Sequence, residues 1–530
     1  MLAGGKGKGD KQSFSTFTHR VMTTLIGIDA GTSAIKAVAF SLDGEALAQA
    51  ACETPLSRPQ PGWVEQDMEE TWTRTGTVIR RVVQALPDGA DIAAVGVTAQ
   101  GDGCWLIDED GRPVRDAILW SDGRASPYIR DWQASGVAAA LYDICGCAPF
   151  PGSSVPILNW LQDEEPATVK RADLIFHCKD WIRYRLTGVR TIDPSDATLP
   201  FLDVEQGTYS ETVPGLVGVP ALQTMRPPLA DPTDVVGTVT PAAAKATGLV
   251  AGTPVVSGIL DIAACAYGSG AVRPGDRSSV VGTTSLNQAL QDTPNTEPRN
   301  VGFTIALGDE RWTRVMASMA GTPNLDWVLS ELMDTDDFDA VEARVRDVPV
   351  GAEGVMYHPY LSASGERSPF LEPAARAQFT GLDPEHTRGH LARAVYEGVA
   401  LAMRDCYEHM GGEAEAVLMG GGGARSALWC QIFADCLGTR VDVPAGEEFG
   451  AKGVALLAGV GVGLYDDLTS AVDRTTGVAR SYEPTPARTE QYALLYDLYR
   501  ETYEAMFDVW ARREEVMAAL RTEEATPITS

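Results

Sequence analysis

The sequence predicts an α/β protein with two domains of related topology around a central cleft. The chain has 530 residues, enough for two or three domains. Apolar, β-branched runs alternate along it with segments of helical spacing. Two similar openings, "IGIDAGTS" and "VVGTTS", each run from a strand into a turn of glycine and hydroxyl residues, in the first half and again in the second. Their similarity indicates a duplicated fold.

The first half opens with three short strands, a helix and a buried strand. Alternation and turn signals predict strands at 25–29, 35–40 and 46–51. Apolar residues at helical spacing predict a helix within 67–86, and the continuous apolar run 91–99 predicts a strand. Polar residues follow this strand directly.

The second half repeats the pattern. Residues 275–290 predict a strand that enters a Gly-Thr turn, and residues 414–438 predict a strand, a glycine loop and a helix. We place the boundary at 270/271, which gives domains 23–270 and 271–465. In the remainder, 466–530, aromatic residues at helical spacing predict a helix that docks on a core and frays after Leu520.

Composition excludes several classes of function. The net charge of -29 argues against nucleic acid and anionic membrane surfaces as partners. Nine scattered cysteines without zinc-type spacing fit a reducing cytoplasm. Residues 1–22 lack the apolar stretch of a secretory signal and predict a disordered extension, with Met22 as a candidate start. We expect a cytoplasmic protein, and the sequence leaves its oligomeric state open.

Three glycine-bearing turns could present backbone N–H groups to phosphate oxygens. The first is Gly31-Thr32-Ser33, the second is Gly282-Thr283-Thr284, and a structural turn is the alternative for each. Asp29 precedes the first turn and suits a metal ion that is bridged to phosphates. The third, 420–423, invites a dinucleotide interpretation, but the GxGxxG spacing fails, so an adenosine contact fits better.

Asp261 is the one charged side chain between Lys245 and Arg273. The sequence predicts a helix at 259–267, which places Asp261 in the first turn, where the helix dipole favours an anion. It could accept the proton of a substrate hydroxyl during phosphoryl transfer. The alternative is a helix-capping aspartate.

Polar residues just past the strand 91–99 are candidates for binding a polyol. Gln100 and Asp102 could contact vicinal hydroxyls, whereas a plain polar loop is the alternative. Lys179 and Asp180 either contact substrate or pair with each other. Two tryptophans, Trp105 and Trp120, could stack on a ligand or pack in the core.

Six ordered motifs together resemble the FGGY family of carbohydrate kinases over about Thr24 to Gly463. They are "GIDAGTSAIKAV", "ILWSDGRA", "SGILDIAACAYGSGA", "GERSPFLEPAARAQFTGLDPEHTRGHLARAVYEGVA", "MGGGGARSALWCQIFAD" and "EEFGAKGVALLAG". The resemblance implies the actin-like ATPase (ribonuclease H-like) fold, with an N-terminal substrate domain and a C-terminal nucleotide domain. It also implies ATP and Mg²⁺ as cofactors.

The resemblance assigns roles to individual residues. Asp261 is the catalytic base and, with Asp29, a metal ligand. The resemblance assigns phosphate contacts to Gly31, Thr32, Ser33, Lys36, Gly282, Thr283 and Thr284. It assigns contacts with adenosine to Gly421, Gly422, Arg425 and Gln431. It assigns substrate contacts to Gln100, Gly101, Asp102, Asp180 and Asp261.

Departures from the family's sequence patterns narrow the range of candidate substrates. Ile157 stands where the N-terminal signature usually has lysine. Gly101-Asp102 replaces the Met-His pair typical of xylulose kinases, and the Arg-Glu pair of glycerol kinases is missing. The motifs resemble erythritol kinases most and L-xylulose kinases next.

We therefore expect phosphorylation of a terminal hydroxyl on a small polyol or ketopentose. A xylulose- or L-xylulose-type kinase is the first alternative. A non-catalytic sugar-binding protein of the same fold, a filament-forming actin relative and an oxidoreductase are the others.

Overall fold

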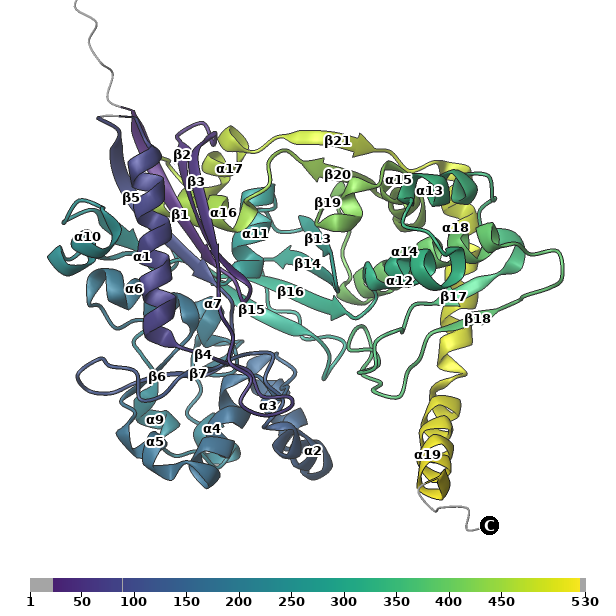
Figure 1. Cartoon of the computed structure of the whole chain (residues 1–530), viewed down its shortest axis with the longest axis horizontal. Coiled ribbons are helices and arrows are strands. Elements are labelled where there is room, and N and C mark those ends of the chain that lie inside the picture. Colours follow the sequence, from purple (N-terminus) through teal and green to yellow (C-terminus); the bar gives the residue numbers. More distant parts are fainter. Residues whose placement is uncertain (1–21, 88, 525–530) are drawn as a thin grey trace, which may run out of the picture.

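The computed structural model describes residues 22–87 and 89–524 and contains two large mixed sheets, one in each half (Figure 1). In the first sheet, β1 pairs antiparallel with β2, β2 pairs antiparallel with β3, and β5 and β12 continue parallel to β1. An antiparallel β11 closes the other edge. In sheet order the strands are β11 (Val235–Thr238), β12 (Pro254–Val256), β5 (Asp91–Ala99), β1 (Thr23–Ala30), β2 (Ala34–Ser41) and β3 (Ala46–Glu53).

The second sheet repeats this pattern. β13, β14 and β16 form an antiparallel meander, β19 and β20 run parallel to β13, and β21 closes the edge antiparallel. In sheet order the strands are β15 (Phe303–Gly308), β16 (Arg311–Ser318), β14 (Ser285–Gln291), β13 (Arg277–Val281), β19 (Ala416–Gly420), β20 (Arg440–Pro444) and β21 (Val478–Tyr482). The predicted duplication is therefore confirmed.

The predicted N-terminal elements are confirmed to within two residues at each end. The strands predicted at 25–29, 35–40, 46–51 and 91–99 are β1, β2, β3 and β5. The predicted helix is α1 (Met68–Ala85), whose N-cap Asp67 accepts hydrogen bonds from two backbone N–H groups of the first turn. Local pattern alone was sufficient for these elements.

One helix of the second half packs against the first sheet. Helix α16 (Phe449–Gly461) lies on β1 and β5 and beside α11 (Asp261–Ser269). A Cβ on Gly27 would lie 1.7 Å from the carbonyl oxygen of Ala451, and one on Gly96 would lie 2.1 Å from that of Val454. Backbone therefore rests directly on backbone, and α16 ties the two halves together.

Short elements surround the two sheets. The remaining strands are β4 (Glu65–Gln66), β6 (Trp105–Ile107), β7 (Ala117–Ile118), β8 (Leu174–Phe176), β9 (Leu202–Asp203), β10 (Thr208–Tyr209), β17 (Met356–His358) and β18 (Gln378–Thr380). Helices of the first half are α2 (Ser126–Ser135), α3 (Val137–Cys145), α4 (Ser154–Glu164), α5 (Pro166–Arg171), α6 (Cys178–Thr187), α7 (Pro194–Ala197), α8 (Val213–Leu216), α9 (Leu222–Met225) and α10 (Pro241–Thr247). Those of the second are α12 (Pro323–Trp327), α13 (Phe338–Arg346), α14 (Arg388–Met410), α15 (Ala427–Leu437) and α17 (Leu468–Thr475).

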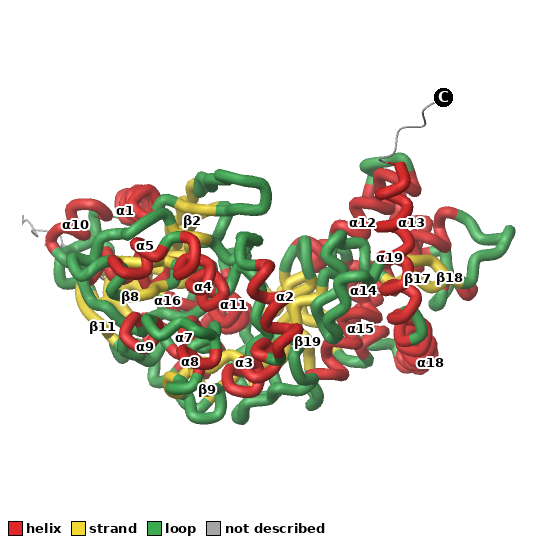
Figure 2. The backbone as a smooth tube through the Cα atoms, turned by 90° about the horizontal axis from the view of Figure 1, so that it is seen from below, coloured by secondary structure: helices red, strands yellow, loops and turns green. Residues whose placement is uncertain are grey.

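Viewed from below, most of the first half lies in one lobe and most of the second half in the other, with α16 of the second half inside the first lobe (Figure 2). Helix α3 bridges them, since the hydroxyl of Tyr142 donates to the carbonyl oxygen of Thr296. Within the described residues, no helix combines the length and apolarity needed to cross a bilayer.

Two helices end the described chain, α18 (Pro486–Glu504) and α19 (Phe507–Glu524). The predicted docking face is confirmed, because Tyr492, Tyr496, Tyr499 and Tyr503 are buried. Fraying after Leu520 was expected, but α19 continues to Glu524. Residues 1–21 of the predicted extension and residues 525–530 lie outside the described part.

Candidate active site

The carboxyl ends of β1, β5 and β12 meet at one edge of the first sheet. Asp29 is the penultimate residue of β1, Gln100 follows β5, and the loop after β12 leads to Asp261. The backbone N–H of Gln100 donates to the carbonyl oxygen of Ala30 over 3.0 Å, which places two of these ends side by side. Open α/β sheets bind ligands at such an edge. Three predicted site residues therefore converge.

Asp261 is the first residue of α11, so this helix begins two residues later than the predicted 259. The reason is Leu260, whose extended backbone (ψ 145°) cannot belong to the helix. Asp261 is a partly exposed residue, and its Oδ1 accepts a hydrogen bond from the Ile262 backbone N–H over 2.7 Å. It therefore uses one oxygen locally, at an accessible position.

The environment of Asp261 favours the protonated form. Burial and, next, repulsion from Asp29 raise the pKa of Asp261 to about 8, and the carboxylates of Asp196 and Asp102 add to the repulsion. A carboxyl group whose pKa lies near neutrality is suited to accept and release a proton. The alternative of a plain capping aspartate does not account for this cluster of like charges.

Asp29 lies against the N-terminus of α16. A Cβ on Gly450 would lie 2.4 Å from the Oδ2 atom of Asp29, so only glycine lets this helix end approach the carboxylate. Burial raises the pKa of Asp29 to about 6, against the attraction of Lys36. The Nζ atom of Lys36 forms an ion pair of 2.8 Å with Glu448. The predicted phosphate ligand Lys36 thus stands beside Asp29, held by a glutamate that the motifs did not single out.

Asp29 and Asp261 fit a divalent cation. Both residues are partly exposed, and their carboxylates lie within electrostatic reach of each other, since the charge of Asp29 raises the pKa of Asp261. Carboxylate oxygens are preferred ligands of Mg²⁺. A cation held between them would remove the repulsion that their proximity creates.

The turn of Gly31, Thr32 and Ser33 connects to the polar residues after β5. The hydroxyl of Thr32 donates to the Oε1 atom of Gln100 over 2.9 Å, and the indole N–H of Trp120 donates to the Thr32 hydroxyl over 2.8 Å. The amide of Gln100 is therefore already engaged inside the protein, where it joins the predicted phosphate turn to the predicted substrate loop.

The two candidate tryptophans differ in their surroundings. Trp105 is fully buried in the core, whereas Trp120 is 42% exposed beside Thr32. Of the two alternatives, core packing applies to Trp105, and Trp120 remains available to stack on a ligand.

Asp102 adopts a backbone conformation that is unusual for its type, with φ at 56°. Its side chain is 9% exposed, and its buried Oδ1 atom has no hydrogen-bond partner among the described residues. Burial raises the pKa of Asp102 to about 7, although the nearby His177 lowers it. A Cβ on the preceding Gly101 would lie 2.2 Å from Leu260, so glycine is needed where this loop passes the base segment.

The two glycine turns of the second half also lie together. Gly282 to Thr284 follow β13, Gly421 and Gly422 follow β19, and these strands are parallel neighbours. Gly421 has a φ of 83°, and a Cβ there would lie 2.5 Å from the carbonyl oxygen of Val281. The carbonyl oxygen of Gly282 accepts a hydrogen bond from the backbone N–H of Thr322 over 2.7 Å. The sequence motifs do not include the loop that carries Thr322.

The two remaining adenosine candidates lie around α15. Arg425 is exposed just before this helix. The amide nitrogen of Gln431 donates to Asp435 Oδ1 (3.0 Å) and to the carbonyl oxygen of Glu483 (2.9 Å). Gln431 thus braces α15 against the chain that leads into α18, and its contact with adenosine stays a prediction.

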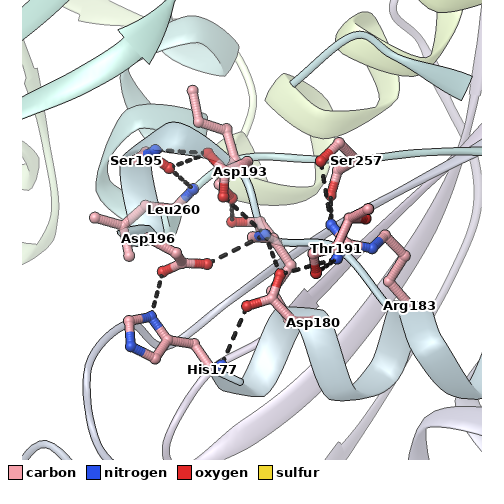
Figure 3. A network of polar contacts seen from close by, with 12 residues as sticks. His177, Asp180, Arg183, Thr191, Asp193, Ser195, Asp196, Ser257 and Leu260 are labelled. Atoms are coloured by element: carbon pink, nitrogen blue, oxygen red, sulfur yellow. Dashed lines mark hydrogen bonds and ion pairs between the residues drawn. The ribbon is translucent and has the colours of Figure 1, made fainter. Parts of the chain in front are cut away.

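Asp180 lies in a buried ionic cluster instead of on the accessible side of the sheet edge (Figure 3). Its Oδ1 atom lies 2.8 Å from Lys179 Nζ and 3.2 Å from Arg183 Nη2, and all three side chains are fully buried. The ion pair of Lys179 and Asp180, one of the two sequence alternatives, is therefore present. A direct contact of Asp180 with substrate stays a prediction.

Comparison with known proteins shows the family to which this chain belongs. Residues 24–268 match the N-terminal domain, and residues 278–462 the C-terminal domain, of the FGGY family of carbohydrate kinases. An erythritol kinase of Brucella abortus (strain 2308) is 34% identical over 92% of this chain and 97% of its own length. An L-xylulose/3-keto-L-gulonate kinase of Escherichia coli (strain K12) is 30% identical over 92% and 98%.

The fold agrees with solved structures. The crystal structure of a xylulose kinase from Rhodospirillum rubrum covers 92% of this chain and 100% of its own, with a TM-score of 0.83 and 29% identity. The predicted actin-like ATPase fold is thereby confirmed. Family match, relatives and fold agree, and the chain belongs to the FGGY family of carbohydrate kinases.

Proposed function

We propose that this carbohydrate kinase transfers the γ-phosphoryl group of ATP to a terminal hydroxyl of a small neutral polyol of the erythritol type. The observation that carries the proposal is the pair Asp102 and Asp261. Asp102 offers a buried oxygen without a donor among the described residues, and the partly exposed residue Asp261 offers a carboxylate within electrostatic reach of it. Two hydrogen-bond acceptors suit a ligand whose polar groups are all hydroxyls, because each hydroxyl can donate a hydrogen bond.

Asp261 acts as the general base. Its ionised carboxylate accepts the proton of the attacking hydroxyl, whose oxygen forms a bond to phosphorus as the bond from phosphorus to the oxygen of ADP breaks. Asp102 orients the polyol by accepting a second hydroxyl, and Trp120 stacks on its carbon face.

Asp29 and Asp261 would hold Mg²⁺, which when bound neutralises charge on the phosphates. Backbone N–H groups of the turns at Gly31 and Gly282 bind phosphate oxygens. The glycines after β19 and Arg425 line the adenosine side.

The charge of the site favours a neutral substrate over a sugar acid. Asp102 and Asp261 interact electrostatically, and each would repel a substrate carboxylate. An erythritol kinase is among the relatives in the 30–34% identity range, and the Gly101-Asp102 pair favours this type over xylulose kinases. We place the enzyme in the cytoplasm, where ATP is abundant.

A coupled ADP-release screen tests the proposal. Tetritols, pentitols, D- and L-xylulose, glycerol and 3-keto-L-gulonate are compared at equal concentration, with Asp261→Asn as the blank. We expect the highest kcat/KM with a tetritol and the lowest with the sugar acid. Preference for a ketopentose would instead establish a xylulose-type kinase. Binding of a polyol without ADP release would indicate a non-catalytic sugar-binding protein.

A further inference from the structure

The backbone that carries Asp261 is held by a side chain from another part of the chain. The backbone N–H of Leu260 donates to the hydroxyl of Ser195 over 2.9 Å (Figure 3). That hydroxyl in turn donates to the Oδ2 atom of Asp193. Ser195 and Asp193 are fully buried, and Leu260 is 3% exposed. The position of Leu260 is thus set by a serine that is 65 residues away in the sequence.

The N-cap residue of helix α11 supplies no side-chain contact that would fix where the helix begins. Its N-cap residue is Leu260, whose side chain offers no hydrogen-bond acceptor, and no side chain caps the helix. The hydroxyl of Ser195 accepts a hydrogen bond from the backbone N–H of Leu260 itself and so holds the chain at the point where the helix begins. Because Asp261 is the next residue, the direction of its carboxylate follows the backbone at Leu260.

The opposite end of the same loop is held by the same cluster. The Nη1 atom of Arg183 donates to the carbonyl oxygen of Ser257 over 2.9 Å and to its hydroxyl over 3.1 Å. Arg183 also pairs with Asp180. The loop 257–260 is therefore fixed at both ends before it delivers Asp261.

Lys179 is the centre of this cluster. Its Nζ atom lies 2.8 Å from Asp180, 2.8 Å from Asp193 and 3.2 Å from Asp196. His177, Asp180 and Asp196 approach closely enough to hold a metal ion, but both carboxylates already pair with the ammonium group of Lys179. His177 pairs with Asp196 over 3.0 Å. The cluster is therefore a closed ionic network centred on an ammonium group.

We propose that Ser195, Asp193 and Lys179 are positioning residues for Asp261. All three side chains are fully buried, so they act through Leu260 and do not touch the substrate. Lys179 fixes Asp193, Asp193 fixes the hydroxyl of Ser195, and this hydroxyl fixes the backbone one residue before the base. The inference rests on the proposed role of Asp261 as the base.

Ser195→Ala tests the chain of contacts. Misplacement of a catalytic group by about 1 Å costs up to ~100-fold in rate, so we expect kcat to fall roughly 10- to 100-fold. The KM for ATP should stay within about twofold, because the glycine turns are untouched. The control is Ser269→Ala, which removes a buried hydroxyl from the other end of α11, where it donates to the carbonyl oxygen of Ala266. Its kcat should be that of the wild type.

A double mutant separates positioning from general stabilisation. A residue that acts only through Asp261 has nothing to position in Asp261→Asn, so adding Ser195→Ala should change the residual rate less than about twofold. A further loss as large as that in the wild type would overturn the proposal. Asp193→Asn, which keeps the shape of the side chain, should reproduce both results if Ser195→Ala does not fold.

The outcomes distinguish this proposal from the proposed function. Full activity of Ser195→Ala alongside an inactive Asp261→Asn overturns the positioning role alone. Full activity of Asp261→Asn overturns the base assignment, and the positioning role falls with it.

Discussion

The Nε2 atom of Gln288 donates to the carbonyl oxygen of Ile262 over 3.0 Å. Gln288 lies in β14 of the second sheet and is fully buried, whereas Ile262 directly follows Asp261. The same strand begins at Ser285, immediately after the turn proposed to bind phosphate. One strand therefore connects the nucleotide side to the helix that carries the base.

Replacing Gln288 should weaken this connection. Gln288→Leu leaves the carbonyl oxygen of Ile262 without its side-chain donor and should lower kcat several-fold. Loss of a buried hydrogen bond costs about 1–3 kcal/mol, so the melting temperature should also fall. Steady-state kinetics and calorimetry measure both effects. Gln291→Leu, at the far end of the same strand, is the control, and equal losses in the two variants would contradict a specific link to α11.

Asp261 should make stability depend on pH in the metal-free protein. Its pKa is raised to about 8 when folded, so the folded state retains a proton that the unfolded state releases near pH 4. This contribution to stability is complete below about pH 4 and is lost as the pH rises toward 8. Asp261→Asn, which stays neutral, should therefore melt several degrees above the wild type at pH 9 in EDTA.

The wild type and Asp261→Asn also test whether Asp261 binds Mg²⁺. Mg²⁺ added at pH 9 should raise the melting temperature of the wild type more than that of Asp261→Asn, because binding relieves repulsion only where both carboxylates are present. Equal shifts in the two proteins would remove Asp261 from the metal site.

Asp102 should control the recognition of the polyol. Asp102→Leu removes the buried acceptor and should reduce kcat/KM for the polyol by up to ~10⁴-fold, the range seen when a site built for hydroxyls loses a partner. Asp102→Asn keeps Oδ1 and should lose far less. The KM for ATP, measured in both variants, should stay constant. Similar losses in the two variants would show that charge, and not the acceptor, matters at this position.

The sequence predicted the elements whose signals are local. Asp29 and Gln100 were found because each ends or follows an apolar strand, and parallel strand ends share an edge. The start of α11 was placed two residues early, because Ser195, remote in sequence, holds Leu260. Such a contact has no periodicity that could reveal it.

Polar residues within apolar strands are a weaker signal in the sequence. Gln288 stands inside "SLNQAL", where an amide in a buried strand requires a partner. The partner itself, Ile262 in the other half of the fold, could not be identified without the topology. Glu448, which holds Lys36, was missed for the same reason.

Close backbone contact beneath the site should make Gly96 irreplaceable. A Cβ on Gly96 would lie 2.1 Å from the carbonyl oxygen of Val454, so Gly96→Ala must push α16 away from β5. Overpacking a core costs typically 1–3 kcal/mol, and a rigid backbone neighbour places this variant at the upper end. Gly450 at the start of α16 lies so close to Asp29 that a Cβ there would be 2.4 Å from its Oδ2 atom, so the KM for ATP should rise as well.

Gly215→Ala is the matched control, because a Cβ there would meet nothing within 4 Å and its φ is not left-handed. Fewer conformations of the unfolded chain should leave its stability equal to or slightly above that of the wild type. Urea unfolding compares the two variants with the wild type. Gly96→Ala can affect Asp29 only by moving α16. If Gly96→Ala is destabilised but its KM for ATP is unchanged, α16 stabilises the fold without positioning the metal site.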